Sequence, residues 1–365
     1  MKITEIKLVQ EKECQRLSGY CGDFLLWYEF PLSMDITLKA DAFVAASLIP
    51  AMATKQNIEL ADDIPVSAQL LSNLSKLQDI FSRWEAQLGV KLHKIDILGG
   101  QRVEALPVND HVISFFSGGV DGTYTFLKNK DDIDLLLFSK GIDMQLDNVE
   151  QFEHAFEKNK VFLDAFEKPL VPIATNVRFF GHSLGLKWTQ CFGGGLASIA
   201  LAASVKTCYI ASGFTYGKTI QEGSNYITDP LWSNGTTHIV HDGAEANRLE
   251  KIAFLATEPT AIALIRVCWQ DKGYNCGQCE KCLRTMTNLR LLGLSTPNFP
   301  PLTDELVKNK VSKLRLYSVH DVDFLQENLA LAVEKQDKVM VKALKKISRH
   351  YYVKHHIKGL LKQLS

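Results

Sequence analysis

The sequence has no excess charge of either sign and no apolar run long enough to cross a membrane. Its 365 residues include 41 basic and 41 acidic side chains, a balance that gives no general attraction to nucleic acid or lipid. The N-terminus, MKITEIKLVQ, lacks the apolar core of a secretion signal. The apolar stretch 191–204 is too short and too rich in glycine for a span, so we expect a buried helix there. These absences predict a cytoplasmic protein that does not enter a membrane.

Two common phosphate-binding motifs are also missing from the glycine-rich stretch SGGVDGT, residues 117–123. No lysine follows, as a P-loop requires, and the glycines do not follow the G-x-G-x-x-G spacing. The stretch nevertheless lies where a strand is expected to end and a helix to begin near Thr123. Backbone N–H groups at such a junction favour an anion, and Ser117 and Thr123 add hydroxyl donors. Asp121 would cap the helix or hold a divalent cation; a plain strand–helix turn is the alternative.

The length of the chain and its changes of pattern predict two domains and a tail. Residues 1–108 are interpreted as a separate α+β module, with an aromatic strand at 24–30 and an amphipathic helix that begins after Ser67. This module contains no cluster of catalytic residue types. Its two cysteines, Cys14 and Cys21, are interpreted as ordinary thiols.

Residues 109–300 alternate strands with helices. Strands are expected at 111–116, 133–139, 170–175, 207–212 and 237–241, and helices at 149–166, 184–204 and 244–256. This alternation indicates an α/β domain with a doubly wound parallel sheet. Functional loops should then follow the carboxyl ends of the strands.

Residues 301–365, which follow a proline-marked linker at 295–301, are expected to be helical. No acidic residue follows Asp337, whereas eight basic residues do: Lys338, Lys342, Lys345, Lys346, Arg349, Lys354, Lys358 and Lys362. The pattern fits either a solvated helix face or a docking surface for a polyanion or an acidic partner protein.

Four of the eight cysteines, Cys268, Cys276, Cys279 and Cys282, have the spacing C-x7-C-x2-C-x2-C. In a reducing compartment such clustering indicates a metal rather than disulfides, and four thiolates suit tetrahedral Zn²⁺. Gly277 allows the tight turn between ligands. An iron–sulfur cluster uses similar short spacings and is the alternative. Four protein ligands leave no open position, so this zinc would be structural.

The glycine stretch and the cysteine cluster together resemble a known family. SGGVDGT resembles the S-G-G-x-D-[ST] signature of the PP-loop ATP pyrophosphatases, and CGQCEKCLR, residues 276–284, resembles the end of the 7-cyano-7-deazaguanine synthases in that superfamily. The resemblance covers about residues 111–292. It implies a loop that grips the pyrophosphate of ATP, with Mg²⁺, while a carboxylate is activated as an acyl-adenylate. In that family ammonia then gives an amide, a second ATP dehydrates it to a nitrile, and the zinc is structural.

The resemblance implies an ATP site formed by Ser117, Gly118, Gly119, Val120, Asp121, Gly122, Thr123, Phe138, Ser139 and Gly213. Catalytic roles are expected for Ser117 and Asp121, and Lys218 would supply a cation. The chain departs from the family at Gly122, where the pattern has a hydroxyl, and at Gly243, where it has a lysine. It also departs at 192–195 and 225–233, which replace stretches of the family's substrate pocket.

These departures lead to three hypotheses. The first is an adenylating enzyme whose acceptor, a small molecule or a protein, is larger than a free base and is held partly by residues 1–108. Those residues would otherwise cover a sheet edge or form a homodimer interface. Relatives with additional N-terminal modules occur in bacterial defence operons. The second hypothesis is a PP-loop enzyme that modifies tRNA, and the third is a non-catalytic nucleotide-binding partner in a larger complex.

Overall fold

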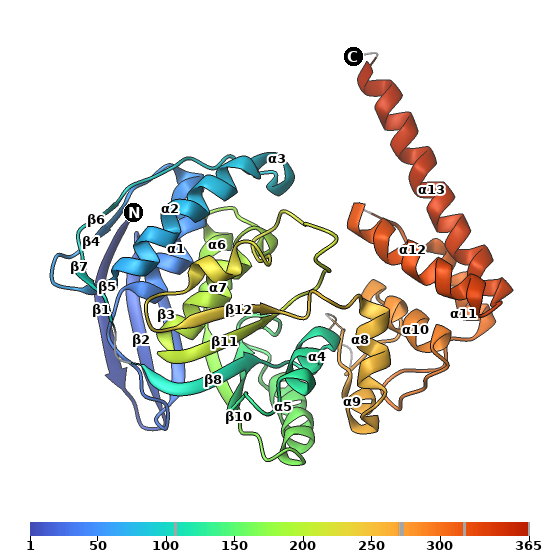
Figure 1. The fold of residues 1–365 in the computed structure, drawn as a ribbon, viewed down its shortest axis with the longest axis horizontal. Coiled ribbons are helices and arrows are strands. Elements are labelled where there is room, and N and C mark those ends of the chain that lie inside the picture. Colours follow the sequence, from blue (N-terminus) through green and yellow to red (C-terminus); the bar gives the residue numbers. More distant parts are fainter. Residues whose placement is uncertain (106–107, 269, 271–273, 317–318, 364–365) are drawn as a thin grey trace. The chain divides into compact units, whose positions relative to one another are not determined.

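The computed structural model describes residues 1–105, 108–268, 270, 274–316 and 319–363, with 319, 320 and 354–363 described by their backbone alone. The chain forms two compact units. Unit 1 comprises Met1–Ser117 and Asp121–Glu245, and unit 2 comprises Gly118–Val120 and Ala246–Ser365. Figure 1 colours the chain along its sequence and labels most of its helices and strands.

Unit 1 is built on a ten-stranded sheet with the order β12-β11-β8-β9-β10-β3-β2-β1-β4-β6. The first five strands in this order are parallel to one another. They are β8 (Asn109–Phe115), β9 (Leu135–Lys140), β10 (Leu170–Thr175), β11 (Val205–Ala211) and β12 (His238–Asp242). All five lie where strands are expected from the sequence, so the α/β class with a parallel half-sheet is confirmed. Strand β8 pairs with both β9 and β11, and the order of the strands therefore changes direction there.

Both faces of this parallel half are covered by helices. Helices α4 (Val120–Lys128) and α5 (Val149–Asp164) follow β8 and β9, and Phe138 of β9 packs against α5, with its ring centroid 4.9 Å from that of Phe152. The neighbouring residue Leu137 instead joins the buried core that includes α1 (Asp41–Thr54) and α7 (Trp188–Ala202). Successive side chains of a strand point to opposite faces, and both faces of β9 are apolar because both are covered.

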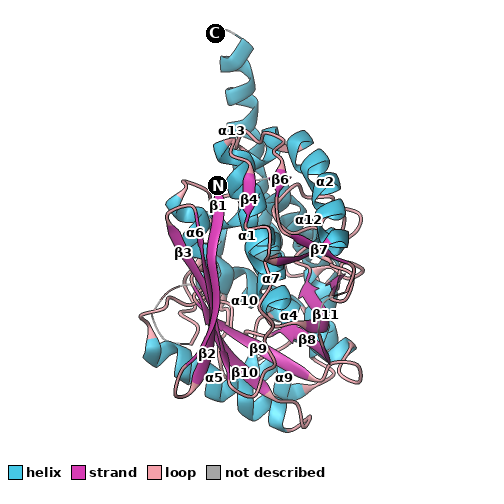
Figure 2. Ribbon diagram, turned by 90° about the vertical axis from the view of Figure 1, so that its left-hand side faces the viewer, coloured by secondary structure: helices cyan, strands magenta, loops and turns pink. Residues whose placement is uncertain are grey.

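The N-terminal residues do not form a separate module but extend the same sheet (Figure 2). Strands β1 (Lys2–Gln10), β2 (Cys14–Cys21) and β3 (Phe24–Pro31) pair antiparallel in sequence order. Strand β3 then pairs with β10, with Tyr28 opposite Thr175. Tyr28 Oη also donates a buried hydrogen bond of 2.9 Å to Ser198 Oγ in α7. The boundary expected at residue 108 is therefore not a structural one, because β3 covers what would otherwise be the open edge of β10.

The remaining elements of the first hundred residues complete this half of unit 1. Helix α2 (Ala68–Arg83) begins as expected after Ser67, whose side chain accepts a hydrogen bond from the Leu70 backbone N–H at 3.2 Å. The short elements are β4 (Ile58–Leu60), β5 (Pro65–Ser67), α3 (Glu85–Leu88), β6 (Ile97–Leu98) and β7 (Gln101–Val103).

Residues Gly193–Gly195 lie inside α7, where they allow close packing. A Cβ atom on Gly194 would lie 2.8 Å from the backbone oxygen of Ala45 in α1, and one on Gly193 would lie 2.0 Å from the backbone oxygen of Gly223. Both distances are shorter than a methyl group tolerates. Glycine at 194 thus has a steric reason, since a residue with a side chain there would separate α7 from α1.

Unit 2 is helical in its described residues. It contains α8 (Arg248–Leu255), α9 (Pro259–Leu264), α10 (Glu280–Leu291), α11 (Asp304–Asn309), α12 (Val319–Glu334) and α13 (Lys338–Gln363). The boundary expected at residue 300 is not followed either, because α10 packs with the later helices. Asn288 Nδ2 donates to Asn328 Oδ1 at 2.8 Å, and Arg290 Nε donates to Asp337 Oδ2 at 2.8 Å. Among the described residues, no helix combines the length and the apolar character that a membrane span requires.

Candidate functional site

The glycine stretch connects β8 to α4. Strand β8 ends at Phe115 and α4 begins at Val120, three residues before the start expected from the sequence. Gly118 has a φ of 74°, a conformation that residues with a side chain rarely adopt. Within unit 2, the Arg266 backbone N–H donates to the Gly118 carbonyl oxygen at 2.8 Å. The first N–H groups of a helix have no partner within the helix and favour an anion, so the start of α4 is a candidate phosphate site.

At the start of α4, the hydroxyl group of Thr123 differs from the expectation that it donates to a bound anion. Asp121 and Gly122 are partly exposed, whereas Thr123 is fully buried and its Oγ1 has no hydrogen-bond partner among the described residues. A Cβ atom on Gly122 would lie 3.2 Å from the backbone oxygen of Phe115. Glycine at this position therefore lets the first turn of α4 pass close to the end of β8.

The parallel registers place several of the expected residues at one edge of the sheet. Phe115 pairs with Leu137 and Ser114 pairs with Tyr209, so extending both registers brings Ser117, Ser139 and Ser212 to one level. Ser139 Oγ is buried and has no partner among the described residues. Phe138 differs from this group because its ring is buried against α5. The Phe138 side chain therefore does not reach this edge.

A small pocket lies at the carboxyl ends of β11 and β12, entirely within unit 1. Its volume of about 30 Å³ is room for about one water-sized molecule. Gly213 and Lys218, two of the expected site residues, line it. The other lining residues are Phe192, Ala211, Ser212, Phe214, Glu222, Ser224, Asn225, Tyr226 and His241.

The buried carboxylate of Asp229 organises the wall of this pocket. Its Oδ2 lies 2.7 Å from His241 Nδ1 and accepts a hydrogen bond of 2.6 Å from Ser224 Oγ. The backbone N–H of Asn225 donates to its Oδ1 at 3.2 Å. An Nδ1–H donated to Asp229 would orient the imidazole and leave Nε2 of His241 to exchange a proton with a ligand. The segment 225–233 therefore supplies both Asp229 and Asn225 to the wall of the pocket.

Glu222 brings a second acidic group to the same pocket. Burial, together with the nearby negative charge of Asp229, raises the pKa of Glu222 to about 7. A carboxyl group that titrates near neutral pH is suited to proton transfer. Glu222 and His241 were not among the site residues predicted from the sequence. Their positions after β11 and at the end of β12 were the available signal, since functional groups in such sheets follow the strands.

An ion-pair cluster lies at the end of β12, near Gly243, which the sequence resemblance aligns with a lysine of the PP-loop proteins. Gly243 has a φ of 86°, so a lysine would be strained there. The cation is instead Lys128 of α4, whose Nζ lies 2.8 Å from Asp242 Oδ1 and 2.5 Å from Glu245 Oε1. Burial alone would raise the pKa of Glu245, but its hydrogen bonds with Lys128 and Tyr124 outweigh that effect and lower it.

The four clustered cysteines of unit 2 converge in space. Their sulfur atoms all lie within 4.8 Å of one another. Cys268 Sγ is 3.9 Å from Cys279 Sγ, and Cys276 Sγ is 3.9 Å from Cys282 Sγ. Tetrahedral zinc with Zn–S bonds of about 2.3 Å requires sulfurs roughly 3.8 Å apart, so the four thiols fit a zinc ion. None of the four is in a disulfide.

The local backbone explains how these four thiols meet. Gly277 has a φ of 65°, as expected for the turn between Cys276 and Cys279. The backbone N–H of Cys279 donates to Cys276 Sγ at 3.2 Å. Cys279 directly precedes α10 and Cys282 lies in its first turn. Arg284, also in α10, pairs with Glu280 and Asp321 and so serves to hold the helices together.

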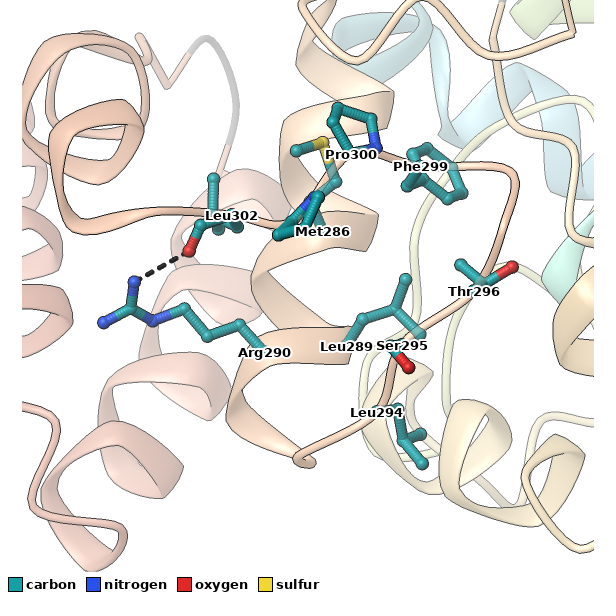
Figure 3. A pocket seen from close by; sticks show the side chains of 10 residues that line it. Met286, Leu289, Arg290, Leu294, Ser295, Thr296, Phe299, Pro300 and Leu302 are labelled. Carbon is teal, nitrogen blue, oxygen red and sulfur yellow. Dashed lines mark hydrogen bonds between the residues drawn. The ribbon is translucent and has the colours of Figure 1, made fainter.

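A larger pocket lies in unit 2, between α10 and the segment 294–302 (Figure 3). It has a volume of about 330 Å³ and mainly apolar walls, formed by residues such as Met286, Leu289 and Phe299. Arg290, the charged residue among those that line it, donates to Leu302 O at 2.8 Å and to Asp304 Oδ1 at 2.7 Å. None of the residues expected to bind ATP lines this pocket. The guanidinium of Arg290 is already bound by protein groups.

Comparison with known proteins returns no relative. No family model matches the chain, and neither the curated proteins nor the solved structures include a significant match. The resemblance to the PP-loop superfamily therefore rests on the two sequence motifs.

Proposed function

We propose that the chain is an ATP-dependent adenylating enzyme that forms AMP and pyrophosphate. The observation that carries the proposal is the position of the glycine stretch. It follows β8, the strand at which the order of the parallel sheet changes direction, and ligands of open α/β sheets bind at that point outside the carboxyl ends of the strands. A helix N-terminus with Gly118 at positive φ suits a phosphate group at the same place.

In this proposal the backbone N–H groups of 117–122 hold the β- and γ-phosphates of ATP. Ser117 adds a hydroxyl donor, and the carboxylate of Asp121 would hold Mg²⁺, which prefers oxygen ligands. When bound, Mg²⁺ spreads the negative charge of the departing pyrophosphate. A substrate carboxylate attacks the α-phosphorus, the bond to the β-phosphate oxygen breaks, and an acyl-adenylate remains.

The small pocket after β11 would serve the second half of the reaction. A nitrogen nucleophile attacks the acyl carbon, AMP leaves, and the proton lost by the nitrogen passes to Glu222 or to His241 Nε2. Lys218 would stabilise the negative charge of the leaving AMP. The support for these roles is that Lys218, Glu222 and His241 line one pocket at the same edge of the sheet as Ser117.

The proposal is tested by a glycine substitution in the loop. Gly119→Val places a branched side chain in the space assigned to the phosphates and should lower the affinity for Mg·ATP at least about tenfold, measured by isothermal titration calorimetry. Gly217→Val is the matched control, because the nearest atom to a Cβ there is 4.0 Å away. Equal affinities of both variants and the parent protein would place the nucleotide elsewhere.

A second variant separates binding from chemistry. Asp121→Asn should retain the nucleotide but lose the incorporation of labelled pyrophosphate into ATP in the presence of a mixture of carboxylates. Exchange at the parental rate in this variant would remove Asp121 from the reaction.

A further inference from the structure

Helix α13 presents a basic face that the proposed function does not use. Lys338, Lys342, Lys345 and Arg349 recur at steps of four, three and four residues, which places them on one face of the helix. These four side chains and Lys346 are all exposed. The opposite face carries the buried apolar residues Met340, Ala343, Leu344, Ile347 and Tyr351.

Helices α12 and α13 lie side by side (Figure 1), and the basic face borders an open groove beside α12. The groove has a volume of about 800 Å³ and is lined by Val333, Gln336, Lys338, Val341, Lys342, Lys345, Lys346 and Arg349. No carboxylate is among the lining residues. Within the part of the chain whose side chains are described, none of the five cations forms an ion pair. Five unneutralised positive charges therefore face the same space.

An exposed aromatic side chain continues the basic stripe. Tyr352 lies three residues after Arg349, on the same face of α13, and its side chain is 52% exposed. The floor of the groove also includes Val333, which is 55% exposed. Cations followed by an exposed aromatic ring match the combination with which proteins hold unpaired nucleotides, where phosphates meet the cations and bases stack on the ring.

We propose that this face of α13 binds a single-stranded nucleic acid, with the five cations on its phosphates and Tyr352 stacked on a base. A lipid surface fits less well, because a helix that lies on a membrane needs an exposed apolar face, and the apolar face of α13 is buried as far as Tyr351. An acidic protein partner also fits less well, since four of the five cations are lysines, and lysine is depleted from protein–protein interfaces.

The experiment uses the full-length protein and a fluorescein-labelled oligouridine of about 20 nucleotides, a length that spans several such sites. Binding is followed by fluorescence anisotropy at about 50 and about 200 mM salt, and we expect the affinity to fall with salt. The variant Lys342→Glu/Lys345→Glu/Arg349→Glu removes three phosphate contacts, so it should bind at least about tenfold more weakly, and the slope of log affinity against log salt should be shallower by about 2. Tyr352→Ala should also weaken binding about tenfold, while Tyr352→Phe should not.

The control variant is Lys7→Glu/Lys76→Glu/Lys91→Glu, which changes the net charge equally at three exposed lysines of unit 1. It should bind as the parent protein does. An equal loss in the control would show a general charge effect and overturn the proposal, as would full competition by polyglutamate of the same length. Stronger binding to phosphatidylserine vesicles than to the oligouridine would assign the face to a membrane instead.

Discussion

At the scale of single residues, Glu222 connects burial with a dependence on pH. Burial raises the pKa of its carboxyl group to about 7 from its usual value of 4.5. Between these two pH values the folded protein therefore binds more protons than the unfolded chain does. The free energy of unfolding then falls as the pH rises through this window, and the stabilisation is complete only below about pH 4.5.

Replacing Glu222 by glutamine should remove this part of the pH dependence. Because the amide is neutral at every pH, Glu222→Gln is expected to be more stable than the parent protein above pH 7, by up to about 3 kcal/mol, and similar to it near pH 4.5. Urea unfolding at about pH 5 and about pH 8 measures the difference. Glu153→Gln, at an exposed position of α5, is the control. A stability difference that is the same at both pH values would contradict the assignment.

At the scale of elements, the sequence predicted those helices and strands whose pattern lies within a short stretch of the chain. The apolar runs predicted all five parallel strands, and the position of Ser67 predicted the start of α2. The pairing of β3 with β10 was missed because it joins residues far apart in the chain and leaves no local pattern. The contact between Asp229 Oδ2 and His241 Nδ1 was missed for a different reason: the two residues are close in the sequence, but they belong to no recognisable motif. The close approach of α1 to α7 is also a non-local property, and it gives Gly194 a packing role that the local sequence does not reveal.

The close approach of α7 to α1 can be tested by a single methyl group. In an exposed helix, glycine to alanine stabilises by about 1 kcal/mol. In Gly194→Ala the new Cβ would lie 2.8 Å from Ala45 O, so we expect a net loss of about 1–3 kcal/mol in the free energy of unfolding. Gly217→Ala, at an exposed and open position, should change it by less than about 0.5 kcal/mol. A more stable Gly194→Ala variant would show that the helices have room to separate.

At the scale of the whole molecule, the division of the chain differs from the boundaries expected at 108 and 300. The first 108 residues belong to the sheet and core of unit 1, so they cannot be deleted as a module. Without them β10 would expose an open edge and α7 would lose α1. A role of these residues in holding the acceptor is therefore better examined by surface substitutions than by truncation. The cysteine cluster, in contrast, belongs with the C-terminal helices in unit 2.

The division into two units predicts which part of the protein becomes less stable when the metal is lost. Four cysteines join the segment at Cys268 to the start of α10, and α10 contacts α12 through Asn288 and Asn328. Since metal binding and local folding are coupled, Cys276→Ser should abolish zinc binding and make unit 2 less stable. Hydrogen exchange followed by mass spectrometry should show faster exchange in α10 and α12, with little change in β8–β12 of unit 1. Elemental analysis of the reduced parent protein should show one zinc per chain, whereas iron with visible absorption would assign an iron–sulfur cluster. Unchanged exchange in α10 after loss of the metal would show that the four thiols do not hold unit 2 together.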